Sequence, residues 1–162
     1  MTTVQSRLEY GKVESAALRA LRSVQTYVDG CGLEQSLLDL IEIRASQING
    51  CAFCLDMHTI DARISGETEQ RIYALSAWQE TPFYTERERA ALLWTETVTL
   101  VADNHVPEDV YDAVAAHFTP EEMVRLTMAV AAINSWNRMA IAFRRVPGLY
   151  KSTRQPALSA EK

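Results

Sequence analysis

Three side chains with reactive chemistry stand close together in the chain: Cys51, Cys54 and His58. The dipeptide Asn49-Gly50 before them is a helix-stop signal, and no Gly or Pro follows until Gly66. This pattern predicts a helix that begins at Cys51. Positions i, i+3 and i+7 of a helix lie within roughly 60° of arc, so the two thiols and the imidazole are expected to share one helix face.

This spacing favours a redox-active dithiol. Side chains at i and i+3 have Cβ atoms about 5–6 Å apart, and the first turn of a helix can tighten enough to close a disulfide. We therefore predict a Cys51–Cys54 bridge in the oxidised protein, with Cys31 left free. A helix N-terminus favours a thiolate, and His58, one turn beyond Cys54, can accept the thiol proton.

The same residues also fit a metal site. A Cys-x2-Cys pair is half of many zinc sites, and Cys51, Cys54 and His58, joined by Asp39 or a water, could supply four ligands. No second Cys-x2-Cys or His pair occurs, and the Cys and His ligands would all come from one helix face. We favour redox thiols over a metal and over a purely structural pair, and we expect no bound metal or organic cofactor.

The string SQINGCAFCLDMH, residues 46–58, resembles the core motif of the AhpD-like alkylhydroperoxidases of the carboxymuconolactone decarboxylase superfamily. The resemblance continues to Gly66, returns in INSWNR at residues 133–138, and covers the chain from about Leu33 to Tyr150. The chain departs from the family's best-studied branch at Phe53, where that branch has a histidine between the two cysteines.

Carried over by position, the resemblance implies that Cys54 is the peroxidatic thiol, Cys51 the resolving thiol and His58 part of a proton relay. The family's relay also has a carboxylate twelve residues before the first cysteine, usually Glu, and the residue at that position here is Asp39. Glu42, one helical turn later, is either a substitute for that carboxylate or a surface charge.

The resemblance also implies an antioxidant enzyme, a thiol-dependent peroxidase of the alkyl hydroperoxide reductase type. Its partners would be a hydroperoxide substrate and a dithiol or thioredoxin-type reductant, and the family's habit of forming oligomers implies a homo-oligomer, a trimer or a hexamer. Two alternatives stay open. One is a zinc-bearing structural or binding module, and the other is a lactone decarboxylase of the wider superfamily, whose chemistry does not call for two thiols.

Composition indicates one soluble globular domain, with 162 residues, 48% hydrophobic and 23% charged. A net charge of −5 and the lack of any Lys/Arg run argue against nucleic acid or an anionic membrane as partner. The N-terminus has no apolar run, and the longest nearly uncharged stretch, Leu126–Asn137, has only 12 residues, too few to span a bilayer. We expect a cytoplasmic protein.

The supporting elements are predicted to be helical throughout, because only six glycines and five prolines punctuate the chain and no segment alternates as a strand does. The fold expected is an all-α, AhpD-like domain of about seven helices. Capping boxes at Thr85 and Thr119 open two of them. The predicted helices are residues 12–28, 33–48, 51–65, 69–78, 85–101, 107–118 and 119–145.

Within one structural domain we distinguish an N-terminal helical segment, residues 1–32, an AhpD-like core, residues 33–150, and a frayed tail, residues 151–162. Apolar residues occupy nearly every face of the last helix between Val124 and Phe143. Such a helix is expected to be buried on all sides, so this stretch is predicted to form part of an interface between copies of the chain.

Other polar residues carry weaker signals. His105 and His117 are expected at the surface or at helix caps, and Asp56 and Asp61 are expected to be solvated charges near a helix start. The segment Trp136-Asn137-Arg138 is placed near the active-site helix by the resemblance alone.

Overall fold

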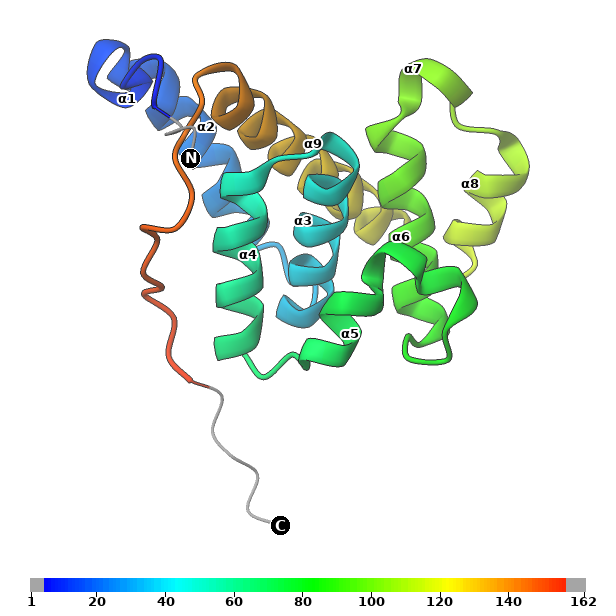
Figure 1. The fold of residues 1–162 in the computed structure, drawn as a ribbon. Coiled ribbons are helices and arrows are strands. Elements are labelled where there is room, and N and C mark those ends of the chain that lie inside the picture. Colours follow the sequence, from blue (N-terminus) through cyan, green and yellow to red (C-terminus); the bar gives the residue numbers. More distant parts are fainter. Residues whose placement is uncertain (1–4, 157–162) are drawn as a thin grey trace.

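The computed structural model describes residues 5–156, and every regular element in that range is a helix, which confirms the all-α prediction. A 3₁₀ helix, η1, accompanies the α-helices (Figure 1). The bounds are α1 Tyr10–Val13, α2 Ser15–Asp29, α3 Gln35–Asn49, α4 Ala52–Ile64, α5 Glu69–Ala74, η1 Leu75–Glu80, α6 Glu86–Thr99, α7 Val101–Asn104, α8 Glu108–Ala115 and α9 Pro120–Ala142.

Helix α3 forms the centre of the domain, with α4 on one side and α6 and α9 on the others (Figure 1). Every residue from Leu37 to Ile43 is buried, so this helix has no solvent-facing stripe over two turns. Asp39 and Glu42 lie in this stretch, with only 2% and 5% of their surfaces exposed. The packing of α3 therefore carries two carboxylates into the interior, where each needs a partner.

Two groups of apolar side chains hold α3 in place. One joins it to α2, α6, α8 and α9, and includes Val28, Ile41 and Leu126. The other joins its opposite side to α4, η1 and α6, and includes Leu40 and Leu75. Burial of each Leu, Ile or Val side chain contributes about 1.5–3 kcal/mol relative to exposure, so these contacts fix the position of α3 and of its carboxylates.

The two helix starts that were predicted from capping boxes are confirmed. Thr85 and Thr119 both accept from the backbone N–H three residues later, and Glu88 and Glu122 accept in return from the N–H of the two threonines. These are complete capping boxes.

Several helix bounds differ from the prediction. The first predicted helix is broken at Glu14, whose side chain accepts from the N–H of Ala16 and so starts α2. The predicted helix 69–78 is α-helical only to Ala74 and continues as a 3₁₀ helix to Glu80. The last α-helix ends at Ala142 rather than Arg145.

Helix α9 was predicted to be buried on all sides with a second copy of the chain covering part of it, and in this single chain one face is exposed. Val124 and Ile141 are 61% and 44% exposed, and Ala131 and Ser135 lie on the exposed face between them. The opposite face packs on α2, α3 and α6. Whether a second copy covers the exposed face stays a prediction. Within residues 5–156, no helix is long and apolar enough to span a membrane.

The chain beyond α9 forms an extended segment, residues 146–156, that passes alongside α4 (Figure 1). It is fixed by three side chains: Asp56 accepts from the N–H of Gly148, Asp61 accepts from the hydroxyl of Tyr150, and Asp39 accepts from Arg154. The prediction of a frayed tail is therefore wrong for residues 151–156, because the buried carboxylate of Asp39 binds a cation from this segment. Residues 157–162 lie outside the described part of the chain.

Candidate functional site

A left-handed turn at Gly50 sets the start of the thiol helix. Gly50 has φ of 67° and ψ of 34°, a conformation that glycine adopts without a Cβ penalty. The N–H groups of Gly50 and Cys51 donate to the carbonyls of Gln47 and Ser46, which closes the end of α3. Cys51 is thus the N-cap of α4, and the helix itself begins at Ala52, one residue later than predicted.

The two cysteines of this turn are joined in a disulfide, with their Cα atoms 5.3 Å apart, and Cys31 is free and buried elsewhere. The sulfur of Cys51 also accepts from the N–H of Cys54 at 3.3 Å, as an N-cap side chain does. Both thiol positions are almost wholly buried, at 1% and 2% exposure. The arrangement has the pairing that the sequence predicted for the oxidised protein.

His58 lies one turn along α4 from Cys54 and contacts a carboxylate of α3. Its Nδ1 atom is 3.0 Å from Oε2 of Glu42, and the two side chains are 8% and 7% exposed. The ring N–H does not point along this line, so the contact is an ion pair rather than an aligned hydrogen bond. The Nε2 atom of His58 has no hydrogen-bond partner within residues 5–156, so it is free to exchange a proton with a reacting group.

The pair stabilises its own charges. Burial opposes the charged form of His58, but the adjacent carboxylate of Glu42 outweighs burial and raises the pKa of the imidazole. Burial likewise opposes the charge of Glu42, but the charge of His58 and hydrogen bonds to the carboxylate outweigh it and lower its pKa. Each of the two charges therefore favours the charged form of the other inside the protein.

Glu42 is held in turn by a chain of amide and indole donors. Gln25 of α2 donates from Nε2 to Oε1 of Glu42 at 3.1 Å, and Trp136 of α9 donates from Nε1 to Oε1 of Gln25 at 3.0 Å. Both oxygens of the carboxylate are therefore engaged, one by His58 and one by Gln25, and its orientation is fixed by side chains from three helices.

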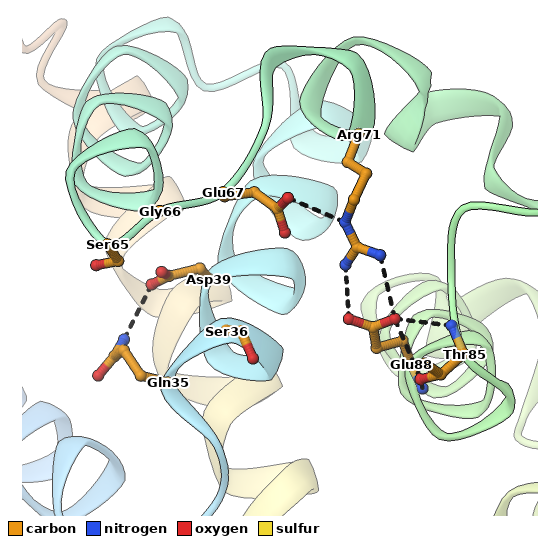
Figure 2. Close-up of a pocket in the computed structure, with 9 residues that line it drawn as sticks. All are labelled: Gln35, Ser36, Asp39, Ser65, Gly66, Glu67, Arg71, Thr85 and Glu88. Atoms are coloured by element: carbon orange, nitrogen blue, oxygen red, sulfur yellow. Dashed lines mark hydrogen bonds and ion pairs between the residues drawn. The ribbon is translucent and has the colours of Figure 1, made fainter. Parts of the chain in front are cut away.

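Asp39, the carboxylate that matches the family by position, has other partners. It accepts from Arg154 at 2.8 and 2.9 Å and from Gln35 at 2.9 Å. Burial raises its pKa, although Arg154 and Gln35 act in the opposite direction. Figure 2 shows Asp39 directed towards Gln35 and Ser65. The carboxylate that contacts His58 is that of Glu42.

Glu42 rather than Asp39 contacts His58 because the two carboxylates point in different directions from α3. Residues three apart on a helix differ by about 60° in direction and by about 4.5 Å along the axis. His58 meets the face that carries Glu42, and Asp39 falls on the edge that meets the C-terminal segment.

A buried polar network braces the turn at Gly50 from the side of α9. Asn49 donates to the side-chain oxygens of Asn134 and Asn137, at 3.0 and 2.8 Å. Asn137, which is fully buried, donates to the hydroxyl of Ser46 at 3.0 Å. This network joins the last turn of α3, directly before the cysteines, to the segment Trp136-Asn137-Arg138.

An open pocket of about 1110 Å³ reaches the thiol site. Its walls come from residues 6–9, α1, α2, α3, α4, the end of α9 and the C-terminal segment. Cys54, His58 and Glu42 line this pocket, and Cys51 does not. A molecule in the pocket therefore meets the sulfur of Cys54 and the imidazole, while Cys51 lies behind them.

A second, smaller pocket of about 340 Å³ lies on the other side of Asp39 (Figure 2). Its one arginine, Arg71, already pairs with Glu67 at 2.9 Å and Glu88 at 2.6 Å. No thiol or imidazole lines it. In the described residues, no three His, Cys, Asp or Glu side chains are grouped so as to hold a metal ion.

Comparison with known proteins identifies the family of this chain. Residues 15–97 match the carboxymuconolactone decarboxylase family. The uncharacterized protein YdfG of Bacillus subtilis is 42% identical over 139 residues, which cover 86% of this chain and 95% of that protein. The chain belongs to the carboxymuconolactone decarboxylase family.

Solved structures place the chain in the AhpD-like part of this family. A protein of unknown function from Agrobacterium tumefaciens, named as a candidate antioxidant defence protein AhpD, is 44% identical with a TM-score of 0.87, over 90% of this chain and all (100%) of that one. The debrominase Bmp8 has the same fold, with a TM-score of 0.72 and 21% identity, over 86% of this chain and 74% of that one.

Three residues of the site, Gln25, Tyr150 and Arg154, were not identified from the sequence. Gln25 lies within the family match but before Leu33, where the motif resemblance seen in the sequence begins, and an isolated glutamine gives no signal. Tyr150 and Arg154 lie on a segment without periodicity. Asp61 was expected to be solvated, and this is wrong, because it is 7% exposed and its carboxylate accepts from the hydroxyl of Tyr150, which lies 2.9 and 3.0 Å from its two oxygens.

Proposed function

We propose that this AhpD-like protein reduces organic hydroperoxides with its two cysteines, with Cys54 as the attacking thiol and Cys51 as the resolving thiol. The observation that carries the proposal is the different position of the two cysteines relative to the pocket. Cys54 and His58 line it, and Cys51 lies behind Cys54 within disulfide distance. A peroxide in the pocket would meet only the thiol assigned to the attack.

The first step forms a bond between the Cys54 sulfur and the distal peroxide oxygen, while the O–O bond breaks. The leaving alkoxide takes a proton from His58 and becomes the alcohol, and Cys54 becomes a sulfenic acid. In the second step the Cys51 sulfur attacks the Cys54 sulfur, the disulfide forms and the S–O bond breaks, and the proton lost by the Cys51 thiol passes to the hydroxyl group, which leaves as water. The cysteine pair supplies both electrons, so the step needs no other reductant.

His58 and Glu42 act on protons in this scheme. In the dithiol enzyme the imidazole takes the proton of Cys54, and Glu42 stabilises the imidazolium that results. The raised pKa of His58 and the lowered pKa of Glu42 support these roles. A general acid of this kind typically contributes about 10²–10⁴-fold to the rate.

The N-cap position of Cys51 suits the return to the dithiol form. Its sulfur accepts from the N–H of Cys54 and lies at the positive end of α4, which favours a thiolate there. A thiol of low pKa is the better leaving group when an external dithiol attacks the disulfide at Cys54. A small dithiol or a thioredoxin-type protein would serve as that reductant.

The test is consumption of cumene hydroperoxide by reduced protein. One equivalent of peroxide should remove two titratable thiols and leave a Cys51–Cys54 bridge in the peptide map, and excess dithiothreitol should give repeated turnover. Cys54→Ser should consume none, and Cys31→Ser is the matched control that should retain turnover. Thiol loss without peroxide reduction, or turnover that survives Cys54→Ser, would contradict the proposal.

The two alternative functions have their own readouts. Zinc bound in proportion to the protein, after purification without a chelator, would support the metal-site alternative. Decarboxylation of a lactone that survives loss of both Cys51 and Cys54 would support the wider superfamily chemistry.

A further inference from the structure

The pocket in front of Cys54 is larger than a small peroxide needs. Its volume of about 1110 Å³ lies just above the roughly 300–1,000 Å³ of pockets that bind drug-sized ligands. Apolar side chains from four parts of the chain line it, among them Leu18, Phe53, Met57, Trp136 and Leu149. A ligand that fills this space therefore has an extended apolar body.

One cation stands over this apolar wall without an acidic partner. The guanidinium of Arg145 lies 3.9 Å above the centre of the Phe53 ring, and Phe53 directly precedes Cys54. The only side-chain hydrogen bond of Arg145 within residues 5–156 is a 3.4 Å contact with the hydroxyl of Tyr10. Stacking on an aromatic ring holds a guanidinium in place and leaves its edge free for a carboxylate.

The other charges of the pocket do not neutralise Arg145. Glu42 pairs with His58, Asp61 accepts from Tyr150, and Asp29 accepts from Gln25. Two further cations, Arg22 and Lys151, also line the pocket and form no ion pair in the described part of the chain. Glu9 is the one acidic side chain of the lining that accepts no hydrogen bond there.

We propose that the site selects hydroperoxides that combine a long apolar body with a carboxylate, as a free fatty acid hydroperoxide does, and that Arg145 binds the carboxylate. This inference rests on the peroxidase function proposed above. The peroxide group reaches Cys54, the hydrocarbon lies on the apolar wall, and the carboxylate forms a paired hydrogen bond with the guanidinium at the rim. The reaction is the one already given: the hydroperoxide becomes the hydroxy fatty acid, and the two cysteines become the disulfide.

The test compares a fatty acid hydroperoxide with its methyl ester, which keeps the body and the peroxide and lacks the charge. The readout is the ratio of kcat/KM for the acid to kcat/KM for the ester, measured within each variant at submicellar concentrations. A charge-assisted hydrogen bond predicts a ratio of at least about tenfold in the unaltered protein. Arg145→Gln should bring the ratio close to one, and the neighbouring Arg144→Gln, which lies outside the pocket lining, should leave it unchanged.

Binding of the product separates this inference from the proposed function. Calorimetry with the disulfide form and the hydroxy fatty acid requires no turnover, and it should give an affinity for the acid at least about tenfold above that for its methyl ester. Preference for the acid in binding, without consumption of any hydroperoxide, would support the binding site and reject the peroxidase. Turnover of cumene hydroperoxide with no preference for the acid over the ester, or a preference that survives Arg145→Gln, would overturn the inference.

Discussion

Two carboxylates one turn apart on α3 have different partners, and this difference assigns them different roles. Glu42 contacts His58 and Gln25, whereas Asp39 binds Arg154 of the C-terminal segment. We infer that Glu42 supports proton transfer and that Asp39 anchors the segment beside α4.

The first prediction concerns these two residues. Glu42→Gln keeps the shape of the side chain and removes the charge beside His58, so it should lower kcat/KM for cumene hydroperoxide by about 10²-fold or more. Asp39→Asn is the matched control on the same buried helix, and it should lower kcat/KM by less than tenfold. Steady-state kinetics with excess dithiol measures both. A larger effect at Asp39 than at Glu42 would return the relay to the position that the family resemblance indicated.

The second prediction is a pH dependence of stability. The pKa of His58 is raised above its usual 6.5, so the stability that this group contributes is fully present below pH 6.5 and is lost as the pH rises through the folded-state value. The pKa of Glu42 is lowered below its usual 4.5, so its contribution is present above that pH and is lost as the pH falls through the folded-state value.

The difference in Tm between the unaltered protein and Glu42→Gln should therefore be largest between about pH 4.5 and 6.5 and should decrease at alkaline pH. In a protein of this size 1 kcal/mol corresponds to about 2–4 °C. Thermal unfolding of both proteins in their disulfide forms, at several pH values from about 4.5 to 9, measures this difference in Tm. A difference that grows towards pH 9 would show that the pair is not ionised as we infer.

At the scale of helices, the turn at Gly50 and the network of Asn49, Asn134 and Asn137 determine where α4 starts relative to α3. The third prediction is that Asn137→Ala lowers the free energy of unfolding by about 1–3 kcal/mol, because it removes the side-chain donor to the buried hydroxyl of Ser46 and one of the acceptors of Asn49. Ser135→Ala, on the exposed face of the same helix, should change it by less than about 0.5 kcal/mol. Denaturant unfolding measures both, and equal effects would show that the network does not hold the turn.

Local signals explain which parts of these helices could be predicted. Gly50, Thr85 and Thr119 act through their own backbone or their immediate neighbours, so the sequence was sufficient for the turn and for both capping boxes. The break at Glu14 has no Gly or Pro, and its cap is a glutamate, a residue that does not mark helix starts.

The site was only partly predictable, because some of its contacts join residues that lie far apart in the sequence. Cys51, Cys54 and His58 lie on one helix, so their spacing alone placed them together. The choice between Asp39 and Glu42 depends on the rotation of α3 against α4, and the contact of Arg154 with Asp39 joins residues 115 positions apart. Neither leaves a periodic pattern in the sequence.

At the scale of the whole molecule, α9 presents an exposed face that includes Val124, Ala131 and Ile141. The fourth prediction is that the protein is a homo-oligomer, a trimer or a hexamer, with this face in the interface, because exposed apolar patches on helices are commonly covered by a partner. Light scattering at micromolar concentration should give a mass above that of one chain, and Val124→Asp should lower it. Val13→Asp on α1, with similar exposure of 65% against 61%, is the matched control and should leave the mass unchanged. A monomer at this concentration would remove the argument.

The proposed reaction assigns the attack to Cys54 and the resolution to Cys51, and trapping the sulfenic acid distinguishes these two roles. Reduced Cys51→Ser is treated with one equivalent of cumene hydroperoxide and then with a dimedone-type reagent, and the adduct is located by mass spectrometry. We predict one adduct, at Cys54, because the attacking sulfur lines the pocket and its resolving partner is absent. Reduced Cys54→Ser, treated in the same way, should give no adduct at Cys51. An adduct at Cys51 in Cys54→Ser, with none at Cys54 in Cys51→Ser, would contradict the account and reverse the roles of the two thiols.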